Sequence, residues 1–276
     1  MRTMLEPANL PEMLTVAMAA ARKVVVLCGA GVSAESGIPT FRDALDGLWS
    51  RFDPLQLASP EGFAADPALV TQWYDHRRVQ VATCQPNPGH HALAAMQDHV
   101  EAAGEAGAGE RGCFTLVTQN VDGLHQRAGS RDVIELHGSI HRWRCCECGC
   151  ERLEQGPAFD AYPPRCEVCG GARRPGVVWF GELLPAQALA TARQRAAECD
   201  LFFALGTSAT VEPAASLILI SAQSGARTCE INPEATPISR LVTWSLRGRT
   251  GELLPPLVQR AFGGDGEGRG AGPAQG

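Results

Sequence analysis

The sequence predicts an α/β protein in which a parallel sheet is joined to a smaller module. Short apolar runs rich in β-branched residues, such as 24–27, are typical of strands that a parallel sheet buries on both faces. A glycine-rich segment follows that first run, at 29–34. The largely helical stretch at 45–88 is too long for a simple crossover between strands, and a cysteine-rich insertion follows at 141–174. The length of the helical stretch predicts that part of it forms a second, helical module.

The glycine-rich segment predicts a nucleotide-binding loop. Its residues, GAGVSA at 29–34, fit the G-x-G-x-x-G/A pattern, in which glycines bring backbone N–H groups close to a pyrophosphate. Glycines after a strand are also common in ordinary tight turns. The residues SGIP at 36–39 should end the next helix after about one turn, because proline cannot continue it. An ordinary dinucleotide fold has a long helix here, so we expect Phe41 and Arg42 in a loop over the ligand.

Composition favours a globular protein that does not bind nucleic acid directly. The 276 residues suffice for one large core or for a main domain with a smaller one, and 45% of them are hydrophobic and 20% charged. The formal net charge of −6 argues against nucleic acid binding, which usually needs a basic excess. No apolar run reaches the length of a membrane span, and residues 1–10 carry no signal-peptide core. We therefore expect a cytoplasmic protein without membrane contact.

Several helices are expected before the second strand. An amphipathic helix over 11–21 should bury the apolar residues Leu14, Val16, Met18 and Ala19. Within 45–88, proline follows a capping residue three times, which is typical of helix starts, at Asp53-Pro54, Ser59-Pro60 and Asp66-Pro67. A further helix is expected over 90–100.

Five later segments are predicted strands, namely 113–118, 133–138, 177–182, 201–205 and 227–231. Each ends in small or polar residues. Because open α/β sheets bind ligands at the carboxyl ends of their strands, we expect one long ligand-binding edge. The composition of 263–276 offers no apolar core, so this tail is expected to be disordered.

Two C-x-x-C pairs predict a zinc site. Cys145 and Cys148 form one pair, and Cys166 and Cys169 form the other. Each turn directs two thiolates at one tetrahedral ion, and four cysteine ligands leave no position for a catalytic water, so the zinc is expected to be structural. The choice of ligands is complicated by two neighbours, Cys146 and Cys150. The cysteines outside the two pairs are expected to be small buried residues or free thiols in a reducing compartment.

Taken in chain order, these motifs resemble those of the sirtuins, a family of NAD-dependent protein lysine deacylases. The resemblance covers about residues 20–258. It rests on GAGVS at 29–33, SGIPTFR at 36–42, TQNVD at 118–122, HG at 137–138, the two cysteine pairs, VWFGE at 178–182, GTS at 206–208 and IN at 231–232. It implies a Rossmann-like NAD-binding domain, with helices on both faces of the sheet, over 1–44, 89–140 and 175–262. The small module would combine a helical insertion over 45–88 with a zinc ribbon over 141–174.

The resemblance also implies a reaction. The acyl-lysine amide oxygen attacks the nicotinamide ribose of NAD, nicotinamide leaves, and the acyl group ends on ADP-ribose. His137 would be the base that activates a ribose hydroxyl, which suits a neutral imidazole with an ordinary pKa of about 6.5. Asn120 and Asp122 would hold the nicotinamide and the reactive ribose. From the residues alone, His137 could instead be a buried histidine bonded to a backbone carbonyl, and Asn120 and Asp122 could cap the next helix.

The binding residues implied by the resemblance fall into two sets. Those expected to contact NAD are Gly29, Ala30, Gly31, Ser33, Gly37, Ile38, Phe41, Arg42, Gln119, Asn120, Val121, Asp122, Gly206, Thr207, Ser208, Asn232, Pro233, Glu234 and Thr250. Acylated lysine peptides and proteins are the expected partners, and a peptide would add as a strand between two loops. The residues expected to bind this substrate are Tyr74, Arg77, Val178, Phe180, Gly181, Glu182 and Val211. We expect the protein to be a monomer.

Tyr74 and Arg77 resemble the Tyr-x-x-Arg signature of sirtuins that remove succinyl and malonyl groups. Residues three apart share a helix face, and a guanidinium with a phenol can hold a terminal carboxylate. Ala44 would leave room for the longer chain, and Trp73 stands where phenylalanine or another aromatic residue is expected. The competing interpretation is an arginine-rich solvated face. The expected activity is therefore removal of acidic acyl groups with some deacetylation.

Other function classes fit the sequence less well. A nicotinamide dehydrogenase would need a long helix where Pro39 stands, and a zinc hydrolase would need an open coordination position. A nucleic acid-binding zinc ribbon would need more basic and aromatic residues around the cysteine pairs. Deacetylation alone and protein ADP-ribosyl transfer remain open as alternatives that use the same cleaved NAD.

Overall fold

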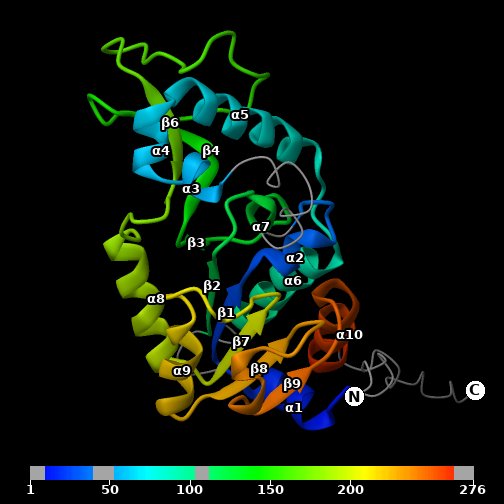
Figure 1. Cartoon of the computed structure of the whole chain (residues 1–276). Helices are drawn as coiled ribbons and strands as arrows, with labels where there is room; N and C mark the ends of the chain where they lie inside the picture. Colours follow the sequence, from blue (N-terminus) through cyan, green and yellow to red (C-terminus); the bar gives the residue numbers. More distant parts are fainter. Residues whose placement is uncertain (1–9, 40–52, 103–111, 264–276) are drawn as a thin grey trace, which may run out of the picture.

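The computed structural model describes residues 10–39, 53–102 and 112–263 (Figure 1). Its main sheet has parallel strands in the order β3-β2-β1-β7-β8-β9. These are β1 (Lys23–Cys28), β2 (Cys113–Thr118), β3 (Ile134–Glu135), β7 (Leu201–Leu205), β8 (Arg227–Ile231) and β9 (Trp244–Leu246). The chain runs outward in both directions from the pair β1–β7, and ligands of open α/β sheets bind at such a switch point.

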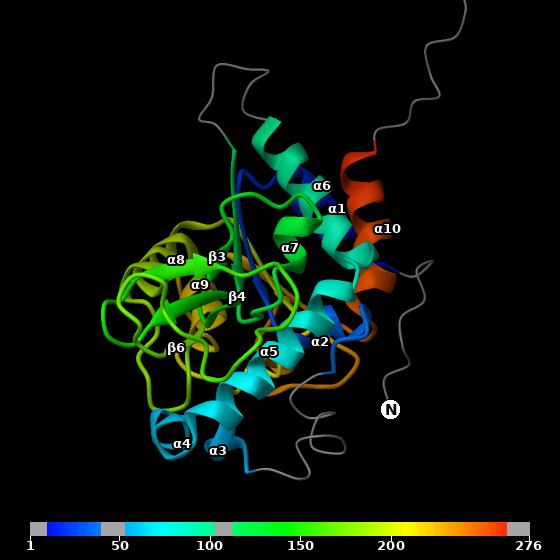
Figure 2. The same cartoon turned by 90° about the horizontal axis from the view of Figure 1, so that it is seen from above.

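Helices cover both faces of this sheet, as predicted. Side chains alternate along β1, so Val24 and Val26 belong to one apolar cluster and Val25 and Leu27 to the other. The first cluster is covered by α1 (Glu12–Ala20), α6 (Pro88–Ala102) and α10 (Thr250–Phe262). The second is covered by α8 (Ala186–Glu198) and α9 (Ser216–Gln223). Figure 2 shows these two groups of helices on opposite sides of the sheet.

A smaller module lies beyond the carboxyl end of the main sheet (Figure 1). Its antiparallel sheet has the order β5-β4-β6 and consists of β4 (Gly138–Cys145), β5 (Glu151–Leu153) and β6 (Arg173–Val177). Three helices accompany it, α3 (Pro54–Leu57), α4 (Pro60–Ala65) and α5 (Pro67–Thr83). A third apolar cluster joins α5 to β4 and β6 through Tyr74, Trp143 and Val177.

The predicted helix starts of this module are confirmed. The side chains of Asp53, Ser59 and Asp66 accept hydrogen bonds from backbone N–H groups two or three residues ahead. Proline follows each of them at the first helical position, where its missing N–H costs nothing.

Three short elements complete the described fold. The helix after β1, α2, spans only Ala30–Ala34, which confirms the predicted break before Pro39. The others are α7 (Leu124–Arg127) and a 3₁₀ turn, η4 (Pro237–Arg240). In the described residues, no helix combines the length and the apolar character that a membrane span requires.

One strand prediction is wrong and another is too long. Segment 177–182 does not return to the main sheet, because Val177 ends β6 and pairs with Gly138 of β4. The residues after it turn back on themselves, with Glu182 N–H donating to the Trp179 carbonyl and Gly181 at φ 85°. In segment 133–138 only Ile134–Glu135 is a strand of the main sheet, since Gly138 already belongs to β4.

Further differences concern short or surface elements. Strand β9 was not predicted, because three residues are too few to show the alternation of apolar and polar residues that indicates a strand. In α1, Leu14 and Met18 are buried as predicted, but Val16 and Ala19 are exposed and Ala17 is buried instead. The inward stripe of this helix follows the i, i+3, i+4 spacing from Leu14.

Candidate active site

The loops after β1, β2, β7 and β8 meet at the switch point of the main sheet (Figure 1). Cys28 of β1 stands opposite Thr118 of β2 and Leu205 of β7, so the residues that follow these three strands emerge side by side. Most of the predicted NAD-binding residues belong to these loops.

Gly29 and Gly31 are required by a close approach of two backbones. A Cβ atom at Gly29 would lie 2.7 Å from the Gly206 carbonyl oxygen, and one at Gly31 would lie 2.8 Å from the Gly206 Cα. Their N–H groups donate to the carbonyls of Leu205 and Gly206 at 2.9 and 2.8 Å. These two N–H groups therefore bind protein and hold the glycine loop against the end of β7 and the loop that follows it.

Ser33, Asn120 and Asp122 form a buried hydrogen-bonded group. The Ser33 hydroxyl donates to Asp122 Oδ2 at 2.7 Å and accepts from Asn120 Nδ2 at 3.0 Å. Asn120 Nδ2 also donates to the Gly29 carbonyl at 3.0 Å. Burial raises the pKa of the Asp122 carboxyl, against the opposing effect of its hydrogen bonds. The group ties the loop after β2 to the loop after β1.

Asp122 also contacts the start of α7, although the N-cap residue of that helix is Gly123. Its Oδ1 accepts from the N–H of Leu124, the first residue of α7, at 2.9 Å. One carboxylate oxygen therefore binds the first residue of a helix while the other binds Ser33.

His137 lies where the chain passes from the main sheet to the small module. Its Nδ1 is 2.9 Å from the Gln119 carbonyl, which can only accept, so Nδ1 carries the hydrogen. Burial lowers the pKa of His137 below its ordinary value, and the bond to Gln119 opposes this shift. The ring is thus a neutral imidazole whose Nε2 can accept a proton. The predicted bond to a backbone carbonyl exists, and it orients the ring as a base.

The second half of the site follows β7 and β8. Gln119 Nε2 donates to the Thr207 hydroxyl at 3.1 Å, which links this half to the loop that carries Asn120. Asn232 Nδ2 donates to the Thr207 carbonyl at 2.8 Å, and Asn232 Oδ1 accepts from Glu234 N–H at 3.3 Å. The Ser208 hydroxyl lies at the surface, 2.8 Å from Thr210 Oγ1.

Not all predicted NAD residues join this group. Phe41 and Arg42 lie outside the described residues. Thr250 begins α10 with 2% of its surface exposed and packs against Gly89 of α6, so it belongs to a helix start and not to a loop. Ile38 packs at the edge of the small module's apolar cluster.

The predicted substrate loop, 178–182, is fastened at both ends. Val178 N–H donates to the His137 carbonyl and Phe180 N–H to the Ala58 carbonyl, both at 2.9 Å. The Phe180 side chain is 49% exposed, but Glu182 points inward. Its carboxylate accepts from both Nη atoms of Arg174, at 2.6 and 2.9 Å. Glu182 thus holds the loop, whereas Phe180 faces solvent.

Tyr74 and Arg77 occupy different environments on α5. Tyr74 is 7% exposed, and its hydroxyl accepts from the Trp179 indole N–H at 3.1 Å. The Arg77 guanidinium lies 4.8 Å from the centre of the Trp73 ring. Burial lowers the pKa of Arg77, and the nearby Tyr74 opposes this shift.

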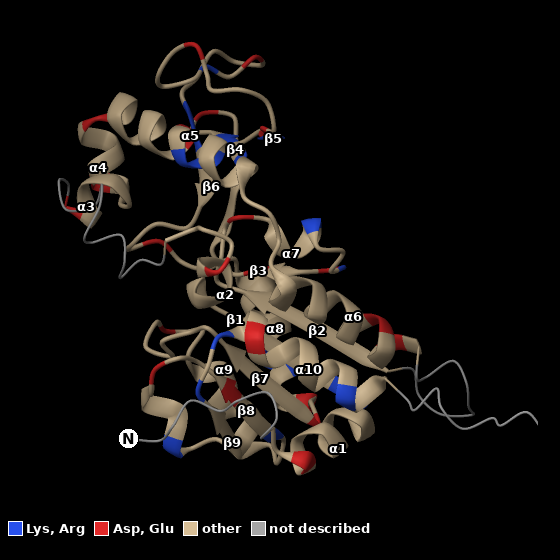
Figure 3. Ribbon diagram, turned by 90° about the vertical axis from the view of Figure 1, so that its right-hand side faces the viewer, with Lys and Arg blue, Asp and Glu red and all other residues tan. Residues whose placement is uncertain are grey.

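A cavity of about 250 Å³ runs along the face of α5 that carries Arg77, lined by Leu69, Gln72, Trp73, His76, Arg77 and Gln80, whereas the buried Tyr74 is not among its lining residues. The neighbouring Arg78 is 1% exposed and pairs with Asp75, so the run of arginines is not a solvated face. Figure 3 shows basic residues gathered where α5 meets β4 and β6.

The two cysteine pairs fit a zinc ion. The Sγ atoms of Cys145, Cys148, Cys166 and Cys169 lie within 4.8 Å of one another, as four tetrahedral ligands must. Cys150, one of the two neighbours that complicate the choice of ligands, also lies beside them, with its Sγ 3.3 Å from that of Cys148 and 3.2 Å from that of Cys166. The C-x-C spacing of 148–150 was the signal for this fifth thiol.

Arg174 and Trp179 are contact-forming residues that sequence reasoning did not single out. Arg174 stacks on Trp179, with its guanidinium carbon 3.3 Å from the ring centre. Trp179 lies inside the motif VWFGE, but no hydrophobic period or residue spacing in the sequence indicates that its partners lie on α5 and β6.

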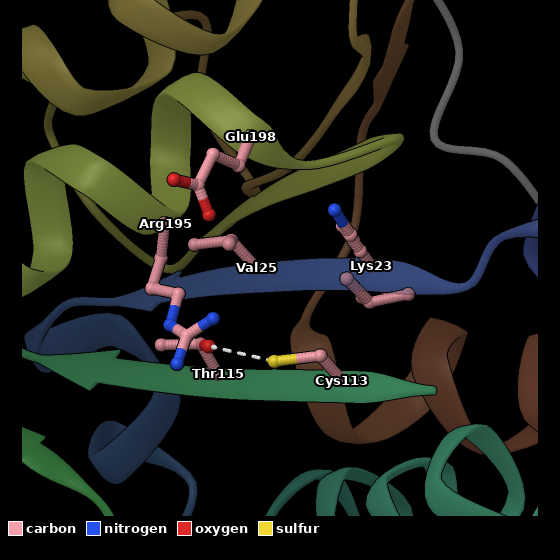
Figure 4. A pocket seen from close by; sticks show the side chains of 7 residues that line it. Lys23, Val25, Cys113, Thr115, Arg195 and Glu198 are labelled. Atoms are coloured by element: carbon pink, nitrogen blue, oxygen red, sulfur yellow. Dashed lines mark hydrogen bonds between the residues drawn. The ribbon is translucent and has the colours of Figure 1, made fainter. Parts of the chain in front are cut away.

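A small cavity at the opposite end of the sheet does not belong to this site. It is lined by the starts of β1 and β2 and the end of α8, including Lys23, Cys113 and Glu198 (Figure 4). Its volume of about 10 Å³ holds at most one water molecule.

Comparison with known proteins agrees with these features. Residues 29–213 match the Sir2 family. The chain is 49% identical to NAD-dependent protein deacylase 1 of Pseudomonas aeruginosa, over 90% of this chain and 97% of that protein. It is 51% identical to the NAD-dependent protein deacylase of Aquifex aeolicus, over 79% of this chain and 86% of that protein.

Solved structures show the same likeness. A Sir2 homologue in complex with NAD has a TM-score of 0.84 and 44% identity, over 92% of this chain and 94% of that one. A Sir2 protein bound to an acetylated peptide has a TM-score of 0.76 and 29% identity, over 91% of this chain and 98% of that one. The chain belongs to the Sir2 family.

Proposed function

We propose that this NAD-dependent protein deacylase removes acidic acyl groups, such as succinyl and malonyl, from lysine side chains, with deacetylation as a second activity. The observation that carries the acyl preference is the placement of Arg77 on α5, where it lines a cavity of about 250 Å³, with Tyr74 three residues before it on the same helix. A partly desolvated guanidinium gains from an anionic ligand, and its planar fork matches a carboxylate.

The residues at the switch point have the chemistry that the reaction needs. NAD supplies the ribose carbon that receives the acyl amide oxygen as nicotinamide departs. His137 takes the proton of a ribose hydroxyl on Nε2, because the bond from Nδ1 to Gln119 fixes that tautomer. Asn120 and Asp122 hold the nicotinamide end, and Ser33 keeps both side chains in place.

The other half of the site binds the nucleotide. Gly206, Thr207, Ser208 and Asn232 follow β7 and β8, where hydroxyl and amide groups suit phosphates and ribose. The lysine substrate adds as an extended strand between loop 178–182 and Val211, whose side chain is 49% exposed. Backbone hydrogen bonds then provide affinity with little reading of the peptide sequence.

The test is a mass-spectrometric assay on matched succinyl- and acetyl-lysine peptides, each with and without NAD. We expect NAD-dependent loss of both groups, with succinyl lost faster. Arg77→Met should lower succinyl turnover at least about tenfold, because a charge-assisted pair contributes about 1.5–3 kcal/mol, and should spare acetyl turnover. Removal of the acetyl group without removal of the succinyl group would refute the proposed preference for acidic acyl groups. Transfer of ADP-ribose to protein without deacylation would replace the proposed reaction.

We also propose that the protein acts as a cytoplasmic monomer on acylated proteins and not on nucleic acid. All eleven cysteines lie in the described residues and none forms a disulfide, which supports a reducing compartment. Cell fractionation and light scattering of the purified protein test location and oligomeric state.

A further inference from the structure

A hydrogen bond joins Trp179 to Tyr74 across two elements of the small module. The indole N–H of Trp179, in the loop after β6, donates to the Tyr74 hydroxyl oxygen on α5 at 3.1 Å. Both side chains are nearly buried, with 2% and 7% of their surfaces exposed. Within the described residues this is the one hydrogen bond of that hydroxyl, so its own hydrogen remains available for another acceptor.

This bond determines that the Tyr74 hydroxyl acts toward a further group as a hydrogen-bond donor. Burial raises the pKa of Tyr74 to about 12, so the hydroxyl keeps its hydrogen at neutral pH. An indole N–H can only donate, so Trp179 occupies a lone pair of the oxygen and turns the hydrogen elsewhere. A terminal carboxylate offers acceptors only, and a phenol held in this way is a matched donor.

Trp179 is itself held from three sides. Arg174 stacks on its ring, with the guanidinium carbon 3.3 Å from the ring centre, and Phe63 of α4 packs at 5.4 Å between ring centres. Glu182 binds the Arg174 guanidinium through both oxygens and accepts from the Trp179 backbone N–H at 2.9 Å. The indole therefore lies between the Arg174 guanidinium, which Glu182 holds in place, and the Phe63 ring.

We propose that Trp179 is a positioning residue for acyl selectivity. By donating to the Tyr74 hydroxyl, it leaves that hydroxyl as a donor to the terminal carboxylate of a succinyl or malonyl group. This inference rests on the proposed preference for acidic acyl groups and adds a residue that does not itself touch the substrate. It also links the acyl pocket to the catalytic end, because Val178 of the same loop binds the His137 carbonyl.

The first test is Trp179→Phe, which removes the N–H but keeps an aromatic ring between Arg174 and Tyr74. We expect KM for a succinyl-lysine peptide to rise about three- to tenfold, while kcat and KM for the acetyl-lysine peptide change less than about twofold. In a Tyr74→Phe background the same change should have no further effect on the succinyl-to-acetyl ratio, since the hydroxyl is already gone.

Trp143→Phe is the matched control. Trp143 is fully buried in the same apolar cluster, and its indole N–H has no partner among the described residues. This variant should lower stability without changing the succinyl-to-acetyl ratio. If Trp179→Phe changed succinyl and acetyl turnover equally, as a packing defect does, the positioning role would be overturned.

A spectroscopic test covers the case in which Trp179→Phe fails to fold. The chain has five tryptophans, whose indole N–H signals are resolved by NMR after nitrogen-15 labelling. Tyr74→Phe should move the Trp179 proton signal upfield through loss of its acceptor and leave the Trp143 signal in place. Five unmoved signals would overturn the inference.

Arg77→Met separates the two proposals. If Arg77→Met and Tyr74→Phe both leave the succinyl-to-acetyl ratio unchanged, the acyl preference itself fails and the role of Trp179 fails with it. If they lower the ratio but Trp179→Phe does not, the acyl preference stands and only the positioning role is wrong.

Discussion

Two adjacent arginines on α5 should respond to the same substitution in opposite ways. Arg78 is 1% exposed and Asp75 0%, and Arg78 Nε and Nη2 lie 2.8 and 2.7 Å from Asp75 Oδ1. The same guanidinium donates to three backbone carbonyls of residues 154–157, at 2.6 to 3.2 Å. Arg78 therefore fastens α5 to the segment after β5, and its guanidinium is too deeply buried to contact a substrate.

Arg78→Met leaves the Asp75 carboxylate buried without a counter-charge. Breaking a buried pair in this way costs about 3–5 kcal/mol, and each kcal/mol lowers the unfolding midpoint of a chain of this size by about 2–4 °C. We expect a fall of about 6–20 °C. Arg77→Met removes the contact with Trp73, which contributes about 0.5–1 kcal/mol or about 1–4 °C of the midpoint, and we expect its total fall to be smaller than that of Arg78→Met.

The assay is thermal unfolding by calorimetry, with both variants purified in the presence of zinc and then assayed on succinyl- and acetyl-lysine peptides. Arg78→Met should lose stability and retain its acyl preference when assayed below its midpoint. Arg77→Met should do the reverse. Equal losses of stability in the two variants would refute the assignment of one structural and one ligand-binding arginine.

Three further predictions concern protons and metal. Burial lowers the pKa of His90 to about 4 and that of His125 to about 3, so both bind protons more readily when unfolded, where the pKa is about 6.5. The free energy of unfolding should therefore be highest above about pH 6.5 and should decrease as the pH falls. Urea unfolding should show about 2–3 kcal/mol less stability at about pH 5.5 than at about 7.5. Equal stability at the two pH values would contradict these pKa shifts. Because burial also lowers the pKa of His137, kcat/KM should reach half its maximum below about pH 6.5, whereas a midpoint above that value would exclude His137 as the base. Cys166→Ala should lose bound zinc by elemental analysis and unfold more easily, while Cys150→Ser should keep one zinc per chain; loss of zinc from Cys150→Ser would place that thiol among the ligands.

Local patterns were sufficient where a few consecutive residues decide the outcome. The buried run of β1, the proline after α2 and the Asp-Pro and Ser-Pro helix starts all depend on neighbours in the chain, and each is confirmed. The cysteine spacing likewise identified four thiols that lie together.

Other features depend on contacts between distant segments. The run VVWFG at 177–181 has the composition of a buried strand, yet it becomes a turn because Trp179 and Glu182 are drawn to Tyr74 and Arg174. The glycine loop follows β1 as predicted, but the sequence did not show that the N–H groups of Gly29 and Gly31 bind the end of β7 and its loop, about 175 residues away in the chain. No sequence pattern distinguishes the environment of Arg77 from that of Arg78. Arg78 is buried because it binds Asp75 and the backbone carbonyls of 154–157, and the latter are distant in the chain.

The acyl preference is tested most directly by competition. Equimolar succinyl- and acetyl-lysine versions of one peptide are mixed with the enzyme and limiting NAD, and the two deacylated products are counted by mass. Their ratio equals the ratio of the two kcat/KM values. We expect succinyl to be removed in excess and the excess to disappear in Arg77→Met. Equal removal, an excess of acetyl removal, or an excess of succinyl removal that survives in Arg77→Met would contradict the carboxylate-binding role of α5.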